Sequence, residues 1–309
     1  GLGDVYKRQV SNYQTLATLP ENEKVTRTEA FRAEMESAIA NADPGDTFRS
    51  RLRSKLQQVF GDDGSYGVFV RSDTNVEDLP GFTGAGLNLT VANVVGVDNI
   101  IEAVSRVWAS PFTARSFAWR QSLMDKPEHV YPAVLLMLSV NADKSGVLVT
   151  QDIDSGNQNW LSVAVNEGVG GAVDGQSSES VRINVITGET RLMAAATAPI
   201  RRQVNLDGGV RKVPVSTRSR VLTDSDIEKL IVFAKELPNR FPAIVNAEGK
   251  PAPADIEFGF LNDELRLFQI RPFLDSDDAQ GNSLLLALDE PLAENAEALV
   301  DLRKKPHSN

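Results

Sequence analysis

Cysteine is absent from this chain of 309 residues, and histidine occurs only at His129 and His307. Without cysteine the chain can form no disulfide, no zinc–thiolate site and no thiol nucleophile. His129 lies in a charged Lys-Pro-Glu-His connection, where a solvated loop residue is the commoner role, and His307 is among the last three residues. With so few histidines, a Ser-His-Asp catalytic triad is not credible either.

Long apolar runs and an excess of positive charge are also missing. A membrane-spanning helix needs roughly 18 or more apolar residues, whereas the longest run here, residues 133–138, has the length of one strand. Acidic residues outnumber basic ones by 42 to 32, and the net charge of −10 argues against a general nucleic-acid binder. A local arginine cluster could still hold an anionic ligand. We therefore expect neither membrane nor nucleic acid as a partner, and the absence of cysteine fits the cytoplasmic protein that we expect.

The length and apolar content predict two or three packed units with a real core. We divide the chain into a helical segment (1–65), a loop-and-helix region (66–130), a mixed-sheet region (131–274) and a loosely held tail (275–309). Residues 1–9 show no apolar periodicity and no signal-peptide core. Two interpretations stay open: a fragment that lacks its N-terminal part, with residues 1–9 foreign to it, or a processed or disordered start.

Capping signals and helical periodicity mark the helices. Thr26-Arg27-Thr28-Glu29 is typical of a capping box, and Phe31, Met35 and Ile39 follow it at helical spacing. A second capping box, at residues 223–226, opens a helix that we expect to end at Pro238. The other predicted helices contain residues 52–60, 98–108 and 112–123, with a tail helix near 284–288.

Strand patterns fill much of the rest. Residues 66–70 predict a strand that delivers Arg71 and Ser72 into a polar, glycine-rich loop over 73–86. The pair Arg201-Arg202 is interpreted as a solvated turn. Further strands are predicted over residues 133–140, 146–151, 160–165, 180–185 and 189–194, and a closing hairpin over 254–260 and 264–270, with its turn at Asn262-Asp263.

The closing hairpin carries polar side chains on two otherwise apolar strands. Strand alternation places Asp255 and Glu257 on one face of the first strand, and Gln269 and Arg271 on one face of the second. Charged groups on a buried face are costly unless something pairs with them. A hard cation such as Mg²⁺ together with a polyphosphate would do so, although a solvated hairpin face is the alternative.

Two other segments suit phosphate. Arg71 offers a charged fork, and the Ser/Thr/Gly loop after it offers hydroxyls and unhindered N–H groups, although an ordinary surface turn has the same composition. The glycine cluster Gly168-Val169-Gly170-Gly171 could let the backbone approach a nucleotide, a weak signal by itself. Lys144-Ser145-Gly146 is interpreted as the polar end of a hairpin.

Four motifs, in their order along the chain, resemble the nucleotide-binding region of the phosphoenolpyruvate synthase / pyruvate, phosphate dikinase family. That family also includes glucan, water dikinase and rifampin phosphotransferase. The resemblance covers roughly residues 66–273, and its most specific parts are the spacing of twelve residues from Glu257 to Gln269 and the Gln-x-Arg-Pro ending. The motifs are Arg71-Ser72 with Glu77-Asp78-Leu79-Pro80, Ser145-Gly146-Val147, Asp255-Ile256-Glu257, and Gln269-Ile270-Arg271-Pro272.

The resemblance implies an α+β, ATP-grasp fold, here only partial, in which two parts close on ATP. It assigns Mg²⁺ at the ATP phosphates to Glu257 and Gln269, and stabilisation of the transferred phosphate to Arg271. It also assigns phosphate contact to Arg71, with Ser72 beside it. A loose phosphoryl transition state is helped mainly by positioning, metal and cations, which agrees with these roles.

The resemblance implies three further nucleotide-binding candidates and one absent group. Asp255 matches the Asp of the family's Asp-x-Glu, and an arginine in the helix after the loop matches either Arg115 or Arg120. Neither histidine lies in the family's Ser-His phosphohistidine motif, so we expect the phosphate acceptor in another segment or protein. The final acceptor would be pyruvate or another small molecule.

Departures from the family leave alternatives open. No Gly-Gly-Lys segment precedes Tyr66, and the family's Gly-Leu-Gly-Glu lacks its acid here. The loop over residues 81–86 is nearer to the glucan dikinase version than to the synthase version. The alternatives are a glucan- or antibiotic-phosphorylating enzyme, an ATP-binding regulatory module without turnover, and a degenerate fragment. We expect weak activity or none from the fragment alone.

Overall fold

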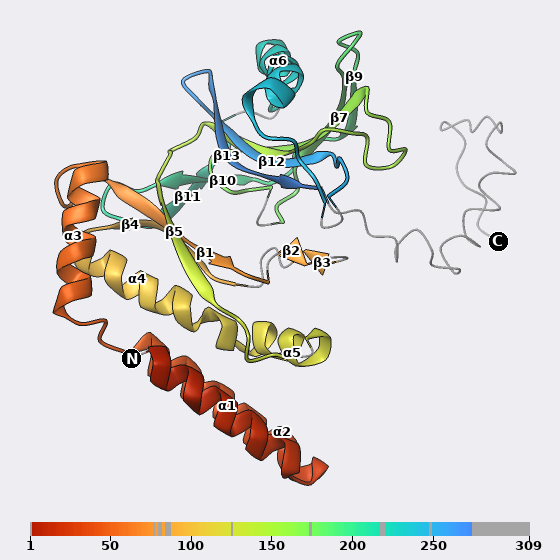
Figure 1. The fold of residues 1–309 in the computed structure, drawn as a ribbon. Helices are drawn as coiled ribbons and strands as arrows, with labels where there is room; N and C mark the ends of the chain where they lie inside the picture. The colour runs from red at the N-terminus through yellow and green to blue at the C-terminus, as the bar shows by residue number, and fades with distance from the viewer. Residues whose placement is uncertain are drawn as a thin grey trace, which may run out of the picture.

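The computed structural model describes residues 2–76, 78–79, 82–83, 88–124, 126–172, 175–216, 220–246 and 249–273. They form a mixed α+β fold in which helices cover antiparallel sheets. Figure 1 shows the layers in order: α6 (Asp224–Arg240), a larger sheet, a smaller sheet, α4 (Val97–Ala109), and finally the N-terminal helices. The two sheets therefore lie between helical layers and turn one face toward each other.

The smaller sheet has one helix-covered face and one open face. Val68 and Val70 are fully buried against α4 and α3 (Asp46–Phe60). Because side chains alternate along a strand, Phe69 and Arg71 lie on the opposite face. The strands, in spatial order, are β4 (Thr90–Val95), β1 (Gly67–Thr74) and β5 (Pro132–Leu138), all antiparallel.

The larger sheet is covered on one face by α6. Ile227, Leu230 and Phe233 of that helix belong to the same buried cluster as Ile256, which is fully buried. Asp255 and Glu257 flank Ile256 and therefore lie on the other face, toward the smaller sheet. The strands, in spatial order, are β13 (Glu264–Pro272), β12 (Ala254–Leu261), β6 (Lys144–Val149), β7 (Trp160–Glu167), β8 (Glu179–Asn184) and β9 (Thr190–Ala194).

The N-terminal helices α1 (Leu2–Thr18) and α2 (Glu21–Ala40) join a separate aromatic cluster with η1 (Ser110–Phe112) and α5 (Ala114–Leu123). The ring of Phe31 lies 6.4 Å from that of Phe112 and 6.1 Å from that of Phe117. Met35 and Ile39 are buried in the same cluster, as the helical spacing predicted. This cluster supports the far side of α4 rather than either sheet.

Two predicted helix boundaries are wrong, and one helix was not predicted. Thr26 lies inside α2, which begins at Glu21 directly after Pro20, because the residues before the apparent capping box are themselves good helix formers. Residues 2–9, for which we found no apolar periodicity, begin α1, in which Leu2, Val5 and Tyr6 do follow a helical spacing. Pro238 lies inside α6, two residues before its end, so the hydrogen bond that a proline cannot donate is lost only in the last turn and little helix follows it.

Two features of the sheets also differ from expectation. We placed residues 131–274 in one mixed-sheet region, but β5 pairs with β1 and so belongs to the smaller sheet. Arg201 and Arg202 form no turn: they lie on β10 (Ile200–Val204), which pairs with β11 (Val210–Pro214) as a separate hairpin.

Within the predicted loop over 73–86, β2 (Asp78–Leu79) pairs with β3 (Phe82–Thr83). The predicted tail helix and His307 lie outside the described residues.

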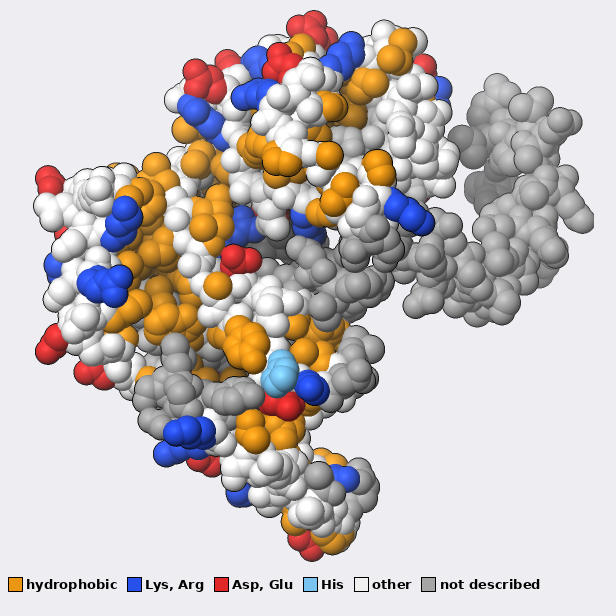
Figure 2. All heavy atoms as spheres, viewed as in Figure 1, with side chains coloured by type: hydrophobic (Ala, Val, Ile, Leu, Met, Phe, Trp, Pro, Cys, Tyr) orange, Lys and Arg blue, Asp and Glu red, His pale blue; other side chains and the backbone are white. Residues whose placement is uncertain are grey.

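The surface in Figure 2 shows hydrophobic side chains gathered along the course of β5. Leu135 and Leu138 of this strand are 48% and 52% exposed, because β5 is an edge strand of the smaller sheet. Within the described ranges, every helix is too short or too polar to cross a lipid bilayer.

Candidate functional site

Arg71 reaches from the smaller sheet to the larger one. Its Nη2 donates to Glu257 Oε2 at 3.1 Å and to Gln269 Oε1 at 2.6 Å. Its Nη1 lies 3.7 Å from the sulfur of Met137 on the neighbouring strand. Because the side chain of Arg71 is only 22% exposed and that of Glu257 24%, this ion pair is stronger than a fully solvated one. Arg71 therefore ties the two sheets together at this point.

Glu257 and Gln269 face each other across the closing hairpin. The antiparallel register of β12 and β13 pairs Glu257 with Gln269 and Asp255 with Arg271. Side chains of directly opposed residues start only about 5 Å apart, so the two oxygens converge on one guanidinium nitrogen. The predicted hairpin, with its polar residues on one face, is thus present.

Arg271 and Asp255 form a second ion pair on the same face. Arg271 Nε donates to Asp255 Oδ2 at 2.9 Å, and the two side chains are 22% and 19% exposed. The pair lies two residues along each strand from Glu257 and Gln269. Each carboxylate on this face is therefore paired with an arginine, Glu257 with Arg71 and Asp255 with Arg271. A bound polyanion would compete with the carboxylates for these arginines.

A cavity of about 230 Å³ opens between the two sheets beside Arg71 and Glu257. Phe69 and Met137 line it from the smaller sheet, and Phe268 lines it from the larger sheet. An apolar cavity with a few charged groups at its edge suits a ligand that has both a flat apolar part and an anionic part.

Ser145 holds the glycine cluster against this cavity. Its buried hydroxyl donates to the carbonyl of Gly168 at 2.7 Å and accepts from the N–H of Gly170 at 2.9 Å. Gly170 lines the cavity and has φ of 72°, a left-handed conformation that favours glycine. The motif at Ser145, which sequence reasoning treated as the end of a hairpin, therefore positions the wall of the cavity.

The remaining predicted residues lie elsewhere around the site. Ser72 follows Arg71 on β1, so strand alternation directs its side chain to the opposite face. Arg115 is exposed on α5. Arg120 on the same helix is 2% exposed in the aromatic cluster, with its guanidinium carbon 4.7 Å from the centre of the Phe112 ring. Burial lowers the pKa of Arg120 to about 10.

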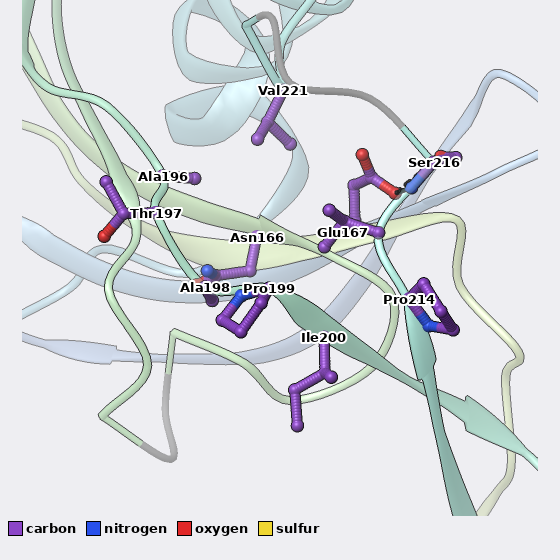
Figure 3. A pocket seen from close by; sticks show the side chains of 11 residues that line it. Asn166, Glu167, Ala196, Thr197, Ala198, Pro199, Ile200, Pro214, Ser216 and Val221 are labelled. Carbon is purple, nitrogen blue, oxygen red and sulfur yellow. Dashed lines mark hydrogen bonds between the residues drawn. The ribbon is translucent and has the colours of Figure 1, made fainter.

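A larger cavity, of about 490 Å³, lies beside Glu167 (Figure 3). The carboxylate of Glu167 accepts hydrogen bonds from the N–H and hydroxyl of Ser216, at 2.8 and 2.5 Å, and lies 3.5 Å from Arg201 Nη1. Among the residues that the structure describes, the lining of this cavity includes no lysine or arginine, and the nearby Arg201 is already paired with Glu167. We therefore place the functional site at the smaller cavity.

The Glu167–Arg201 ion pair was not predicted from the sequence, because the pair Arg201-Arg202 was interpreted as a turn.

The residues at the hairpin fit a hard cation. Glu257 and Gln269 supply one carboxylate and one amide oxygen that already converge on a single positive centre. In the part of the chain that the structure describes, no three or more His, Cys, Asp or Glu side chains group as a metal cluster. One carboxylate and one amide oxygen nonetheless form a donor set that suits Mg²⁺, which takes few protein ligands and completes its shell with phosphate and water oxygens.

The chain is a mixed α+β protein with a cleft between two antiparallel sheets, and this cleft is apolar inside and charged at its edge. The chain belongs to the pyruvate phosphate dikinase AMP/ATP-binding domain family, whose model matches residues 9–287. The relationship that the motifs suggested is thereby confirmed.

Similar proteins include two kinds of phosphotransferase. Rifampicin phosphotransferase of Streptomyces sviceus is 31% identical over 286 residues, covering 87% of this chain and 31% of that protein. Phosphoenolpyruvate synthase of Pyrococcus furiosus is 28% identical over 267 residues, covering 82% and 31%. Rifampicin phosphotransferase of Bacillus subtilis is 28% identical over 216 residues, covering 69% and 24%. The chain thus spans less than a third of the length of these relatives.

Proposed function

We propose that this chain has a partial ATP-grasp fold and binds MgATP in the cleft between its two sheets. The observation that carries the proposal is the convergence of Glu257 Oε2 and Gln269 Oε1 on one nitrogen of Arg71. The two oxygen donors would hold a metal ion, the arginine would bind the phosphate chain, and the apolar cavity would take the adenine base. Membership of an AMP/ATP-binding domain family supports the same ligand.

Each residue has a distinct role in this proposal. Glu257 and Gln269 would hold Mg²⁺, which neutralises charge on the phosphate oxygens when bound. Arg71, freed from Glu257 by the metal, would turn its guanidinium to a phosphate, with Ser72 next to it in the chain. Asp255 holds Arg271 through the 2.9 Å hydrogen bond and would orient it toward the phosphate being transferred. Of the two arginines of α5, the exposed Arg115 is better placed to reach a ligand than the buried Arg120.

Within a complete protein, the phosphate would pass to a histidine outside this chain and then to pyruvate or a related acceptor. A rifampicin- or glucan-phosphorylating enzyme is the second candidate, because rifampicin phosphotransferases and phosphoenolpyruvate synthases are similarly distant, at 31% and 28% identity. A binding module without turnover is the third candidate, because a nucleotide can be held without an acceptor at hand.

Titration calorimetry of the chain with ATP, in the presence and absence of Mg²⁺, tests the proposal. We expect one site, tighter with Mg²⁺ than with a chelator present. If MgATP produced no heat of binding while the protein remained folded, the proposal would be wrong. Transfer of labelled phosphate to a histidine by the complete protein, with pyruvate, rifampicin or glucan offered as acceptors, separates the three candidates.

Arg271 should matter more for turnover than for affinity, because its guanidinium would act on charge that develops in the transition state. In the complete protein we expect Arg271→Met to lower kcat by about a hundredfold or more, with the Kd for MgATP changed less than about threefold. Steady-state kinetics beside calorimetry measures both quantities. Arg266→Met, at an exposed position on the same strand, is the matched control. An equal loss in kcat and in affinity would contradict the assignment.

A further inference from the structure

Asn93 on β4 has a conformation and a burial that no role in its own sheet explains. The register between β1 and β4 shifts between Val68 and Val70, so β4 carries an extra residue there. Asn93 has φ of 51°, in the left-handed region, and is only 2% exposed. Its amide occupies the space above Gly67, where a Cβ would lie 2.0 Å from Asn93 Oδ1. The bulge and the glycine together direct this side chain out of the sheet.

The side chain of Asn93 binds the tip of the β10–β11 hairpin. Asn93 Nδ2 donates to the carbonyls of Asn205 at 2.7 Å and Gly209 at 2.8 Å. The N–H of Gly209 donates to the backbone carbonyl of Asn93 at 2.7 Å. Figure 1 shows β11 running toward β4 at this edge of the molecule. Three hydrogen bonds therefore fasten the hairpin tip to the smaller sheet.

The first strand of the same hairpin is fastened to the segment after β7 and to the connection between β5 and β6. Val169 N–H, two residues after β7, donates to the carbonyl of Arg202 at 2.9 Å, and Val204 N–H donates to Asn141 Oδ1 at 2.9 Å. The contact at Gly168 is so close that a Cβ there would lie 2.2 Å from the carbonyl oxygen of Arg202. The hairpin is thus a rigid link from the glycine cluster to β4.

Both ends of this link border the same cavity. Thr90 and Ala92, just before Asn93, line the cavity from β4, and Val169 and Gly170 line it from the glycine cluster. The hairpin therefore sets the separation between two walls of the cleft. We propose that Asn93 is a positioning residue that, through the β10–β11 hairpin, holds the cleft at the width its nucleotide requires. This inference rests on the proposed binding of MgATP.

The contact needs an amide that can donate two hydrogen bonds from a left-handed backbone. Asparagine tolerates that conformation better than most residues, and aspartate tolerates it equally but has no N–H to donate. Asn93→Gly keeps the backbone freedom and removes the side chain. Asn93→Asp keeps the shape and turns a carboxylate toward two carbonyl oxygens. Leu206→Ser, at a position on the hairpin tip that is 91% exposed, is the matched control.

The experiment measures hydrogen exchange at the Gly209 amide and the Kd for MgATP at a temperature well below the unfolding midpoint. We expect both Asn93 variants to lose protection at Gly209 and to bind MgATP roughly five- to twentyfold more weakly, the loss expected for about two neutral hydrogen bonds. Leu206→Ser should match the wild type. A residue that only stabilised the fold would lower the unfolding midpoint and leave Kd unchanged.

The outcomes separate the two proposals. If the wild type bound MgATP and both Asn93 variants bound it equally well, the positioning role would be wrong while the proposed function stood. Retained protection at Gly209 in both variants would show that the side chain does not hold the hairpin, which also overturns the inference. If the wild type itself did not bind MgATP, the proposed function would fall, and this inference with it.

Discussion

At the scale of single residues, the proposed function would give Glu257 two alternative cationic partners, the guanidinium of Arg71 and a metal ion. In the structure it is 3.1 Å from Arg71 Nη2. A triphosphate would attract Arg71, and Mg²⁺ would replace the guanidinium at the carboxylate. This exchange of partners would make the negative charge of Glu257 necessary for binding MgATP but not for binding metal-free ATP.

Glu257→Gln should therefore discriminate between forms of the nucleotide. We expect the Kd for MgATP to rise by about ten- to a hundredfold, the effect of losing a charged oxygen ligand. The Kd for metal-free ATP should stay the same or fall, because one negative charge near the phosphates is gone. Calorimetry with and without a chelator measures both values. Glu264→Gln, at an exposed position on the same hairpin, is the control, and an equal loss for both ligands would contradict a metal-binding role.

The two arginines of α5 also give opposite expectations. Burial lowers the pKa of Arg120 to about 10, so at neutral pH the folded state holds a cation in an unfavourable environment. Arg120→Met removes that cost and should raise the free energy of unfolding by about 1–2 kcal/mol, with MgATP affinity unchanged. The free energy of unfolding of the wild type should rise relative to that of Arg120→Met only as the pH rises through about 10, where the buried cation loses its proton.

Arg115→Met, at the exposed position, should leave stability unchanged and weaken MgATP binding if Arg115 reaches the phosphates. Urea unfolding and calorimetry on both variants make the comparison. Weaker MgATP binding by Arg120→Met with no gain in stability would reverse the assignment.

At the scale of elements, α6 is tied to the larger sheet through its first turn. Thr223 Oγ1 accepts from the N–H of Asp226, and Asp226 Oδ2 accepts from the N–H of Thr223 and from Lys144 Nζ on β6. Burial by itself would raise the pKa of the Asp226 carboxyl, but the hydrogen bonds from Lys144 and Thr223 outweigh it and the pKa lies below its ordinary value. The helix is therefore held to the sheet by an ionised carboxylate.

Asp226→Asn should cost about 1–3 kcal/mol of stability at neutral pH, because it removes the charge that Lys144 pairs with. Since the folded pKa is below the unfolded one, this contribution is complete above the unfolded carboxyl pKa of about 4 and is lost as the pH falls through the folded value. Urea unfolding at a series of acidic pH values should show the two proteins converging. Asp224→Asn, exposed in the same turn, is the control, and a difference independent of pH would contradict the account.

The two capping boxes show what local sequence can decide. Residues 223–226 form a capping box because nothing before Thr223 continues the helix, whereas Thr26 has the same pattern inside α2. A capping box competes with the helix propensity of the residues before it, and before Thr26 those residues favour helix. The β10–β11 hairpin was missed for a similar reason: its basic strands are held by pairing with each other and by Asn93 and Gly168, contacts that no local pattern contains.

At the scale of the whole molecule, a ligand that binds both sheets should stabilise the fold as a unit. MgATP at about a hundred times its Kd should add about 2.7 kcal/mol to the free energy of unfolding and raise the midpoint by about 5–10 °C. Arg71→Met removes both the tie between the sheets and a proposed phosphate contact. MgATP should therefore raise the unfolding midpoint of this variant by less than about 2 °C. Differential scanning calorimetry measures both. A full shift in Arg71→Met would mean that the ligand does not use Arg71.

The sequence alone determined the two strands of the closing hairpin and its turn at Asn262-Asp263, because alternating apolar residues flank that turn. The register from the turn would set Glu257 opposite Phe268, and the register shift between Glu257 and Phe258 in the structure places Glu257 opposite Gln269 instead. Family membership followed from the same motifs.

Only the tertiary structure decided what the hairpin faces. Arg71 is 186 residues from Glu257 in sequence and lies on another sheet, and Asn93 is 112 residues from Asn205. The free energy that brings such partners together comes from burying Val68 and Ile256 against different helices, α4 and α6. Strand alternation then turns the polar residues beside them toward each other. That packing cannot be predicted from either strand by itself, because each strand determines only which face is polar and not which surface lies opposite.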